Sequence, residues 1–506
     1  MALKLFNTLS RSIQEFMPLD SAGKKVGMYC CGPTVYDFAH IGNWRTFVFG
    51  DLVRRYLEFK GYTVTHVMNI TDVEAKIIKR VSETGMSREE YTKKYETEFF
   101  KDFDILSCKR PTQIPHATDY IEKIKSLIKK LLARGIAYQA ADGSVYFSIE
   151  KYQAAGGRYG QLVKLNPDEL RVGERVKSDE YAKESIADFA LWKARVPEDG
   201  DNSWSSPWGE GRPGWHIECS AMSMEILGPS FDLHLGGEDL IFPHHEDEIA
   251  QSEGATGQPF VKHWLHGAHL LVEGKKMSKS LGNFFTLRDL LAKGFTGREI
   301  RYLLLTAHYR ETFNFTLEGL QGAKAALARI KECLEKVLEI PEDAFQTTTV
   351  PPFTNTSAAD AAVLKSFSSA LDDDLNISKA WGVVFTWIRE LNRKISQNKL
   401  SIAEANFAWA TWKELDRVLG LNIEIKTHPR VVEDKSHIAT LHGGRVFSRL
   451  GGGDVPTEVR DIDMQRLAAK AAKDFKRADA LRDEIKSRGY LVEDTPKGTK
   501  FKEIKH

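Results

Sequence analysis

Cysteine, histidine and glutamate residues at four places in the chain have the chemistry of metal ligands. Cys31 follows a short apolar run, Cys219 lies much later, and His244 and Glu248 are four residues apart. Residues four apart on a helix share one face. Two thiolates, an imidazole and a carboxylate suit zinc. The spacing alone leaves an alternative open, because buried cysteines and His/Glu pairs with this separation also occur in ordinary protein cores.

The residues beside these candidates are expected to have other surroundings. Cys30 precedes Cys31 in a predicted strand, and alternation along a strand turns its side chain to the opposite face. His245, Glu246 and Asp247 would lie on other faces of the predicted helix. We expect these three side chains to contact solvent or to surround the metal ligands.

Two lysines on a short loop could act on phosphates. Lys276 and Lys279 belong to the string Lys-Met-Ser-Lys-Ser, which Gly274 and Gly282 flank. Such a loop can close over a triphosphate, and two charged lysines can neutralise a departing pyrophosphate. An arbitrary pair of lysines with this spacing is more often part of a solvated basic loop. The pair alone therefore does not decide between these interpretations.

A third group of residues precedes a predicted helix. His40, Gly42 and Asn43 come after a predicted strand and directly before an amphipathic run. The N-terminus of a helix binds anions through free N–H groups and the helix dipole. His40 could donate a hydrogen bond to a phosphate there, and Gly42 would let a nucleotide approach the backbone. A loop histidine in a turn is the commoner explanation of a lone His-x-Gly pattern.

The elements around these residues predict a parallel sheet. Residues 26–31 form a short apolar run that ends at a Gly-Pro turn, and 48–57 carry apolar positions at helical spacing up to Gly61. Residues 62–69 are again rich in β-formers. A strand, a helix and a strand at this spacing predict a βαβ unit, in which ligands bind beyond the carboxyl ends of the strands. The segment 32–43 lies at that point.

The rest of the chain alternates between patterned and unpatterned stretches. Further expected elements are a helix over 121–134, a hairpin over 138–147, a charged insertion over 150–190, a helix over 317–338, a linker over 340–358, helical sequence over 359–422, a second linker over 426–457 and a basic helical module with a β-like end over 461–506.

Composition limits the class of protein. The chain has 506 residues, which at roughly 150 residues per domain suggests about three or four domains. The net charge of +1 excludes a chain-wide basic field, although local patches could still bind a tRNA-sized partner. Five scattered cysteines do not form a secreted disulfide framework. The sequence has neither a signal peptide nor a membrane-spanning run, so we expect a cytoplasmic protein.

Several strings together resemble one family. Residues 28–37, 215–220, 242–248 and 276–283 are similar to the signatures of the cysteinyl-tRNA synthetases, which are class I aminoacyl-tRNA synthetases. The match runs through nearly the whole chain. Strings within 478–496 resemble that family's C-terminal anticodon-binding module, and the region 359–422 resembles its helical bundle.

The resemblance implies an α/β protein with a Rossmann-type parallel-sheet catalytic domain and an insertion, followed by a helical bundle and a small C-terminal module. The expected domains are the first catalytic half (1–125), the connective insertion (126–195), the second catalytic half with the zinc site (196–265), the lysine loop and stem-contact region (266–325), the bundle (326–425), a flexible linker (426–457) and the anticodon-binding module (458–506).

The resemblance also implies a site. One zinc ion per subunit would be bound by Cys31, Cys219, His244 and Glu248. Catalysis and ATP binding would use His40, Gly42, Asn43, Gly237, Asp239, Lys276 and Lys279. Thr71 and Trp215 would line the amino-acid pocket. The implied partners are L-cysteine, ATP with Mg²⁺ and tRNA(Cys), and a monomer in the cytoplasm is expected.

One position departs from the family pattern. The first signature usually ends in histidine, but this chain has Asn43, which can donate a neutral hydrogen bond and cannot become a cation. Two rival functions are a cysteine:amino-sugar ligase and a catalytically silent tRNA- or zinc-binding relative. The C-terminal tail argues against the first, and the intact His40, Lys276 and Lys279 argue against the second. A plain nucleotidylyltransferase explains neither the zinc ligands nor the tail.

Overall fold

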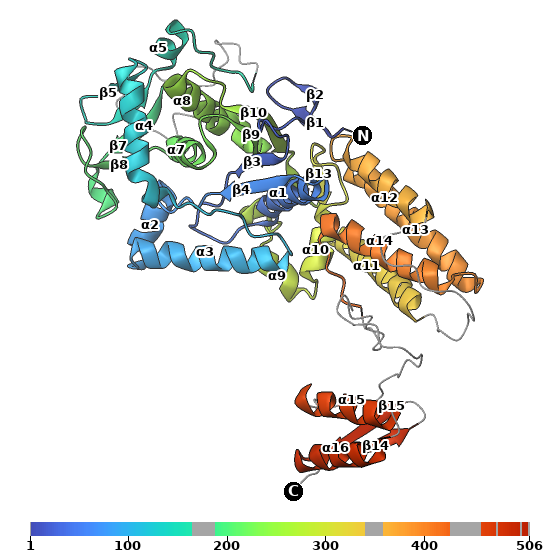
Figure 1. Cartoon of the computed structure of the whole chain (residues 1–506). Coiled ribbons are helices and arrows are strands. Elements are labelled where there is room, and N and C mark those ends of the chain that lie inside the picture. The colour runs from blue at the N-terminus through green and yellow to red at the C-terminus, as the bar shows by residue number, and fades with distance from the viewer. Residues whose placement is uncertain are drawn as a thin grey trace. The chain divides into compact units, whose positions relative to one another are not determined.

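The structure is a computed structural model in which two compact units can be distinguished, Met1–Arg430 and Val431–His506 (Figure 1). It describes residues 2–163, 188–339, 358–425, 457–471, 474–495 and 498–503. The predicted linkers over 340–358 and 426–457, and most of the charged stretch over 150–190, therefore lie largely outside the described residues. Each unit is considered by itself below.

A parallel sheet forms the centre of the first unit. Its four strands have the order β10-β9-β3-β4. They are β3 (Lys25–Cys30), β4 (Thr63–Met68), β9 (Phe231–Gly237) and β10 (Val261–Gly267). All pairs are parallel, and Cys30 lies opposite both Met68 and Leu235 in the register. The carboxyl ends of the strands therefore meet at one edge of the sheet, which confirms the parallel arrangement predicted from the sequence.

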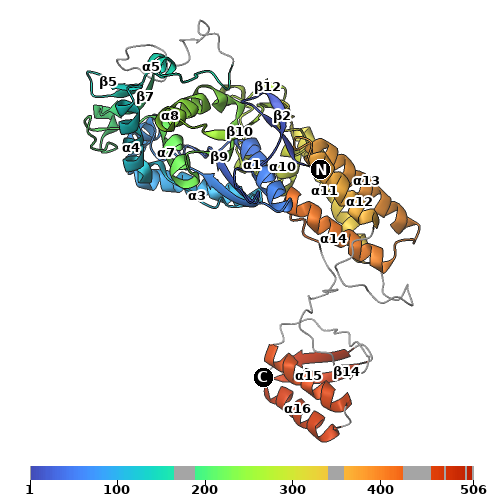
Figure 2. The ribbon, with the colours of Figure 1, turned by 45° about the horizontal axis from the view of Figure 1, so that its top comes forward.

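Helix α1 (Ile41–Phe59) connects β3 to β4 and packs on the sheet (Figures 1 and 2). It begins with reciprocal capping between His40 and Asn43. Apolar residues on several faces are buried, because one side of the helix covers the sheet and another meets the helical bundle. The helix ends before Gly61, whose φ of 93° a residue with a side chain would rarely adopt.

A long excursion separates β4 from β9. Its helices are α2 (Ala75–Thr84), α3 (Arg88–Ile105), η1 (Ala117–Tyr120), α4 (Ile121–Ala133), α5 (Ile149–Ala154), η3 (Pro197–Asp199) and α7 (Trp215–Leu227). Its strands are β5 (Ala137–Gln139), β6 (Val145–Phe147), β7 (Phe189–Ala194) and β8 (Gly211–Pro213), which form an antiparallel sheet in this order. The sheet has its own apolar core. It extends beyond residue 195, where the sequence analysis placed the end of the insertion.

Further segments flank the central sheet. The hairpin of β1 (Lys4–Asn7) and β2 (Ser12–Glu15) lies against β10. Helices η4 (Glu238–Leu240), η5 (Ile241–His245) and α8 (Glu246–Thr256) lie between β9 and β10. After β10 come β11 (Leu270–Val272), β12 (Lys275–Lys276), η6 (Lys279–Leu281), α9 (Leu287–Ala292), α10 (Gly297–Leu304) and β13 (Phe313–Phe315).

Four helices form a bundle, α11 (Leu317–Leu338), α12 (Ala358–Leu371), α13 (Ile377–Ser396) and α14 (Ile402–Leu419). Figures 1 and 2 show it at the opposite end of the first unit from β5–β8. The helical sequence predicted over 359–422 is thus three helices. The first break falls at Asp374 and Leu375, which have φ of 53° and 54°.

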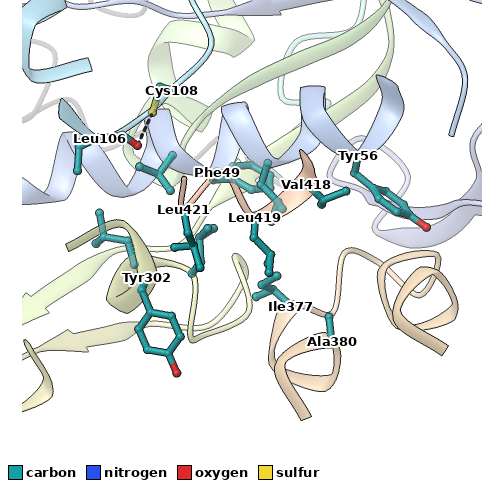
Figure 3. Close-up of a cluster of buried hydrophobic side chains, with 14 of the residues drawn as sticks. Phe49, Tyr56, Leu106, Cys108, Tyr302, Ile377, Ala380, Val418, Leu419 and Leu421 are labelled. Carbon is teal, nitrogen blue, oxygen red and sulfur yellow. Dashed lines mark hydrogen bonds between the residues drawn. The ribbon is translucent and has the colours of Figure 1, made fainter. Parts of the chain in front are cut away.

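The bundle and α1 share one apolar core. Figure 3 shows Phe49 of α1 among Tyr302, Leu419 and Leu421. Polar contacts cross the same junction, since Asp51 of α1 accepts a hydrogen bond from buried Arg301 at 2.5 Å. The other nitrogens of this guanidinium donate to carbonyl oxygens of Leu419 and Leu106. Tyr56 of α1 donates to Asp372 at the end of α12.

The second unit has a small core of its own. Helices α15 (Thr457–Ala471) and α16 (Phe475–Ser487) precede a hairpin of β14 (Tyr490–Thr495) and β15 (Gly498–Glu503). Val459, Ile462 and Ile485 are buried together. The predicted helical module with a β-like end is confirmed. Among the described residues of the whole chain, no helix combines the length and the apolar character needed to cross a membrane.

Candidate active site and metal centre

The four predicted metal ligands come together beyond the carboxyl ends of the central strands. Cys31 follows β3, Cys219 lies on α7, His244 lies in η5, and Glu248 lies in the first turn of α8. One ligand atom from each of them lies within 4.8 Å of all the others. The Nε2 atom of His244 is 3.1 Å from Oε1 of Glu248. Cys31 is half-buried as a residue, and the other three are buried.

Helix α7 presents Cys219 and Trp215 to the same region. These residues are four apart and share a helix face. The indole of Trp215 lies 4.4 Å from the ring of His244, measured between centroids, and keeps 39% of its surface exposed. Gly214 starts the helix, and a methyl group there would lie 1.9 Å from the carbonyl oxygen of Ala190. Glycine thus allows α7 to begin directly against β7.

The electrostatics of the cluster favour the charged forms of Cys219, His244 and Glu248, but not of Cys31. The hydrogen bond from Cys31 lowers the pKa of the Cys219 thiol to about 6, against the effect of burial. Burial raises the pKa of the Cys31 thiol well above its usual value. Burial opposes ionisation of Glu248, but His234 and His244 hold the pKa of that carboxyl at about 2. Burial likewise disfavours the His244 cation, yet Glu248 and Cys219 raise the pKa of His244 to about 10. A metal cation bound in the cluster would compensate for the negative charge of Glu248 and Cys219 in place of the protonated His244 ring.

A chain of polar contacts reaches Cys31 from outside. The hydroxyl of Thr8 is 2.8 Å from Nδ1 of His266, and Nε2 of His266 is 2.7 Å from Nδ1 of His245. Nε2 of His245 is 3.3 Å from the Cys31 sulfur. A neutral imidazole has one N–H group. Donation from Thr8 to His266 therefore leaves His266 to donate to His245, and His245 to donate to the sulfur.

The pKa values of these two histidines agree with neutral rings. Burial and the nearby His234 lower the pKa of His266 to about 3, and burial lowers the pKa of His245 well below its usual value. Such outer contacts orient metal ligands and tune their basicity.

A second series of polar contacts reaches His244. Tyr159 donates to Oδ1 of Asp247 at 2.5 Å, and Nε2 of His216 is 3.5 Å from Oδ2 of the same carboxylate. The Nδ1 atoms of His216 and His244 are 2.8 Å apart. This arrangement commits Nδ1 of His244 to His216 and leaves Nε2 for a ligand bond.

Of the two surroundings expected for His245, Glu246 and Asp247, solvent contact is wrong, because all three are fully buried. The other expectation, contact around the metal ligands, is met by His245, which lies against Cys31. Helix α8 packs against α4 and α7 and therefore has little exposed surface. The carboxylate of Glu246 accepts hydrogen bonds from three consecutive backbone N–H groups at 160–162. Cys30, by contrast, lies in the apolar core on the α1 side, as strand alternation predicted.

A second set of possible ligands overlaps the first. Cys31, His234, His245 and Glu248 also bring their ligand atoms within 4.8 Å of one another. Nε2 of His234 is 2.9 Å from Oε2 of Glu248. This set holds one sulfur, whereas the set with Cys219 holds two.

The predicted nucleotide residues lie at the start of α1. Nδ1 of His40 accepts a hydrogen bond from the backbone N–H of Asn43 at 3.2 Å, and Oδ1 of Asn43 accepts one from the backbone N–H of His40 at 3.1 Å. With Nδ1 as an acceptor, the neutral imidazole carries its proton on Nε2. Asn43 is exposed, and its oxygen is engaged in capping the helix. This capping role was not predicted from the sequence.

The lysine loop lies beside the same helix end. The backbones of His40 and Thr286 form an isolated antiparallel β-bridge, and the Ile41 N–H donates to the carbonyl oxygen of Phe285 at 2.9 Å. A methyl group at Gly42 would lie 3.4 Å from Cε of Met277, so the loop passes close to this glycine. Exposed Lys276 ends β12, and the backbone of Lys279 begins η6.

Two adjacent glycines connect the metal cluster with α1. A methyl group at Gly236 would lie 2.5 Å from Cε1 of His245, and one at Gly237 would lie 3.6 Å from the Thr46 hydroxyl. The exposed Asp239 folds back over Gly237, since its Oδ1 would lie 2.3 Å from the same added methyl group. The two groups of predicted site residues therefore lie on either side of these glycines.

Thr71 is buried and lies in a small polar network. Asn69 donates to its hydroxyl oxygen at 3.2 Å, and the hydroxyl donates to Glu218 at 3.3 Å. Asn69 also accepts a hydrogen bond from the Gly32 N–H at 2.8 Å.

Sequence reasoning gave no role to Asn69, Glu218, His234 and His266. The only local signal for the two histidines is that each lies between apolar or glycine neighbours in a strand of the central sheet.

Comparison with known proteins agrees with this geometry. The profile of the family described as "tRNA synthetases class I (C) catalytic domain" matches residues 17–325, and that of the "DALR domain" matches residues 366–424. These matches, together with a parallel sheet followed by a helical bundle, define the chain as a class I aminoacyl-tRNA synthetase.

The relatives then specify the family. The chain is 46% identical to the cysteine–tRNA ligase of Chlamydia muridarum and 43% identical to that of Protochlamydia amoebophila, over 100% and 99% of this chain and 100% and 98% of the relatives. The chain belongs to the cysteine–tRNA ligase family. The DALR match falls on α12–α14. The strings that resemble an anticodon-binding module lie elsewhere, in the tail of the chain.

Solved structures show the same fold at low identity. A methionyl-tRNA synthetase of Mycobacterium tuberculosis in complex with methionyl-adenylate superposes with a TM-score of 0.56 at 17% identity, covering 78% of this chain and 90% of that one. A putative arginyl-tRNA synthetase of Campylobacter jejuni gives a TM-score of 0.53 at 13% identity, covering 80% of this chain and 94% of that one.

Proposed function

We propose that this chain joins L-cysteine to tRNA(Cys) in two steps. The carboxylate of cysteine attacks the α-phosphorus of MgATP, forming cysteinyl-adenylate and releasing pyrophosphate. A hydroxyl of the terminal ribose of the tRNA then attacks the activated carbonyl and releases AMP. The observation that carries the proposal is the adjacency of a buried thiol-rich cluster and a helix N-terminus across Gly236 and Gly237.

Zinc fits the cluster formed by Cys31, Cys219, His244 and Glu248. The set offers two sulfurs, one imidazole nitrogen and one carboxylate oxygen, which are the ligand atoms that zinc takes in proteins. Burying an ionised carboxylate beside a readily ionised thiol is costly unless a cation compensates for it. The alternative set with His234 and His245 has fewer sulfurs. His234 lies instead within hydrogen-bond distance of Glu248, and His245 within hydrogen-bond distance of Cys31.

Selection of cysteine over serine follows from the same donor set. When bound, zinc would supply a thiophilic Lewis acid, which binds a thiolate far better than a hydroxyl. A pocket that discriminates by size alone gives only modest ratios between such similar substrates. Cys31 is only half-buried, and exposed Trp215 lies beside His244, so the substrate's sulfur would enter between these two residues.

The chain's own residues would bind and polarise ATP. His40 presents its Nε2–H at the helix N-terminus, where it can donate to a phosphate oxygen. Gly237 and Asp239 would face the adenosine. Lys276 and Lys279 would move in with the loop and neutralise the charge that develops on the leaving pyrophosphate. Asn43 would hold His40 in place through the helix cap.

Binding of tRNA would use the parts beyond the catalytic sheet. We assign the anticodon side to the bundle, where the DALR match lies, and to the basic second unit. All five cysteines are free thiols, which is compatible with the reducing cytoplasm. We expect the chain to act there as a monomer.

Charging of tRNA(Cys) transcript with labelled cysteine and ATP, in zinc-supplemented buffer, tests the proposal. Charging with cysteine and not with serine would support it. Cysteine-dependent ATP–pyrophosphate exchange without charging would favour a ligase with another acceptor, such as an amino sugar. Loss of both activities would contradict the proposal and favour a silent binding protein.

A further inference from the structure

A buried arginine near the start of α1 has no role in the site described above. Arg45 lies two residues beyond Asn43 and is 5% exposed. Burial lowers the pKa of its guanidinium to about 10, so the side chain is still a cation at neutral pH. Its Nη1 atom is buried and has no hydrogen-bond partner among the described residues. A buried polar nitrogen without a partner costs stability, so the presence of this arginine calls for another explanation.

Arg45 holds the segment that leads into β13. Its Nη2 atom donates to the carbonyl oxygen of His308 at 3.1 Å and to that of Glu311. The guanidinium carbon also lies 4.9 Å from the centre of the Phe313 ring, at a distance where a cation and an aromatic ring attract each other. A guanidinium is a planar and rigid group of donors, so contacts of this kind define a geometry as well as an energy. The start of β13 is therefore fixed to α1.

Strand β13 in turn holds the strands from which the lysine loop emerges. It pairs in parallel with β11, and β11 pairs with β12, which ends at Lys276. The turn between β11 and β12 is also bound to β13. The Glu273 N–H donates to the carbonyl oxygen of Phe315 at 3.0 Å. The Gly274 N–H donates to the side chain of Asn314 at 2.7 Å. A displacement of β13 would therefore displace Lys276 as well.

The other end of the lysine loop is fixed to the same helix. The Ile41 N–H donates to the carbonyl oxygen of Phe285, and the backbones of His40 and Thr286 form a β-bridge. Both ends of the loop are thus anchored on α1, one at the helix start and the other through Arg45 about one turn later. We infer that Arg45 is a positioning residue. It sets the place of the lysine loop relative to His40, so that the lysines and the imidazole reach the phosphates of one ATP together.

Cysteine-dependent ATP–pyrophosphate exchange by the zinc-loaded full chain tests the inference, which rests on the proposed function. Arg45→Gln should lower kcat about tenfold or more, because a small misplacement of charged groups is costly in catalysis. The zinc content and the KM for cysteine should stay within about threefold of the wild type, since no contact of the metal cluster is removed. In a chain that also carries Lys276→Ala and Lys279→Ala, Arg45→Gln should lower kcat less than about threefold, because no lysine remains to be positioned.

A matched variant and a structural measurement separate positioning from a general loss of stability. Arg54→Gln changes a second arginine of α1, whose side chain donates to Glu58 and to the carbonyl oxygen of Arg110. It should keep kcat within about threefold of the wild type. In Arg45→Gln, backbone hydrogen exchange should become faster over residues 270–276, whereas exchange in β10 should not change.

Two results would overturn the inference. One is an equal loss of kcat from Arg45→Gln with and without the two lysines, and the other is unchanged hydrogen exchange over residues 270–276. If Arg45→Gln does not fold, Arg45→Lys, which lacks the planar group of donors, is measured in the same way and decides by the same criteria. A wild-type chain without cysteine-dependent pyrophosphate exchange would contradict the proposed function instead, and the hydrogen-exchange comparison would still test how Arg45 holds the loop.

Discussion

The metal cluster and the nucleotide end of α1 are built in opposite ways. In the cluster, His234, His244 and Glu248 are buried and each has a side-chain partner at 3.1 Å or less. At the nucleotide end, Asn43 and Lys276 are exposed. The cluster is preorganised by its own contacts. Under the proposed function, the nucleotide side would be completed by the phosphates of ATP.

This comparison predicts that changes in the cluster affect metal binding, while changes at the nucleotide end affect rate alone. The largest expected effect is that of Cys219→Ser. A hydroxyl replaces a thiolate in a buried ligand set, so we expect zinc content well below one per chain and cysteine activation reduced by about 1,000-fold or more, about 4 kcal/mol. Metal analysis and ATP–pyrophosphate exchange measure the two quantities.

Cys333→Ser is a matched control, because Cys333 is a buried thiol on α11 that belongs to neither possible metal-binding group found among the described residues. It should keep its zinc. Wild-type chain stripped of metal should lose its preference for cysteine over serine. If the metal-free chain still rejected serine by orders of magnitude, thiol recognition by the metal would be wrong.

Lys279→Ala should have the next largest effect. Removal of a cation that neutralises the leaving pyrophosphate should lower kcat for cysteine activation by about 100-fold. Zinc content and unfolding free energy should not change. Lys275→Ala, in the same strand as Lys276 but outside the signature, should change kcat less than about threefold. A loss of zinc in Lys279→Ala would contradict the separation of the two regions.

Substitution of Asn43 should have a smaller effect. Asn43→Ala removes the cap of α1 and the contact that orients His40, so we expect kcat for activation to fall about tenfold. Asn43→His restores the usual family residue and should change activation less than about 100-fold, or roughly 2.7 kcal/mol. A larger gain would show that Asn43 impairs catalysis. Steady-state exchange with varied ATP separates kcat from KM.

The smallest effect concerns a buried histidine outside both regions. His66 on β4 is 1% exposed, and neither ring nitrogen has a partner among the described residues. Burial lowers its pKa to about 3, so between pH 6.5 and 3 the unfolded chain binds more protons than the folded one. The free energy of unfolding should therefore fall as the pH falls, by about 1 kcal/mol per pH unit from this group.

His66→Phe should reduce this pH dependence, and His269→Gln, at an exposed histidine, should leave it unchanged. Urea unfolding at pH 7.5 and pH 5.0 compares the variants with the wild type. An equal slope in His66→Phe and wild type would show that the buried ring does not remain neutral.

The sequence was informative where the pattern is local. Strand β3, helix α1 and strand β4 follow from apolar periodicity and from glycine at the helix end, and they position Cys31 and His40. The resemblance to a family supplied the partners of Cys31 from later in the chain. The structure brings those residues together, although their roles remain a proposal.

Other features could not be predicted, since they depend on distant segments. The contact between Thr8 and His266 joins residues 258 positions apart. Solvent contact and contact around the metal ligands were both left open for His245 and Asp247, because helical spacing says nothing about how many neighbours cover a helix. The antiparallel sheet ends at Pro213, because β8 pairs with β7 after an irregular segment that carries no strand signal.

The junction between α1 and the bundle bears on how the chain can be divided. The match to the catalytic-domain profile ends at residue 325. Contacts of α1 nevertheless depend on residues beyond that point, because Tyr56 donates to Asp372, and Arg301, which donates to α1, also donates to the carbonyl oxygen of Leu419. A fragment cut at 325 would expose the apolar face of the helix that carries His40, and would leave the Arg301 guanidinium short of one acceptor. We expect such a fragment to aggregate when expressed alone, whereas a cut near residue 430 would spare every one of these contacts. The smallest autonomous ligase core of this chain therefore includes the bundle.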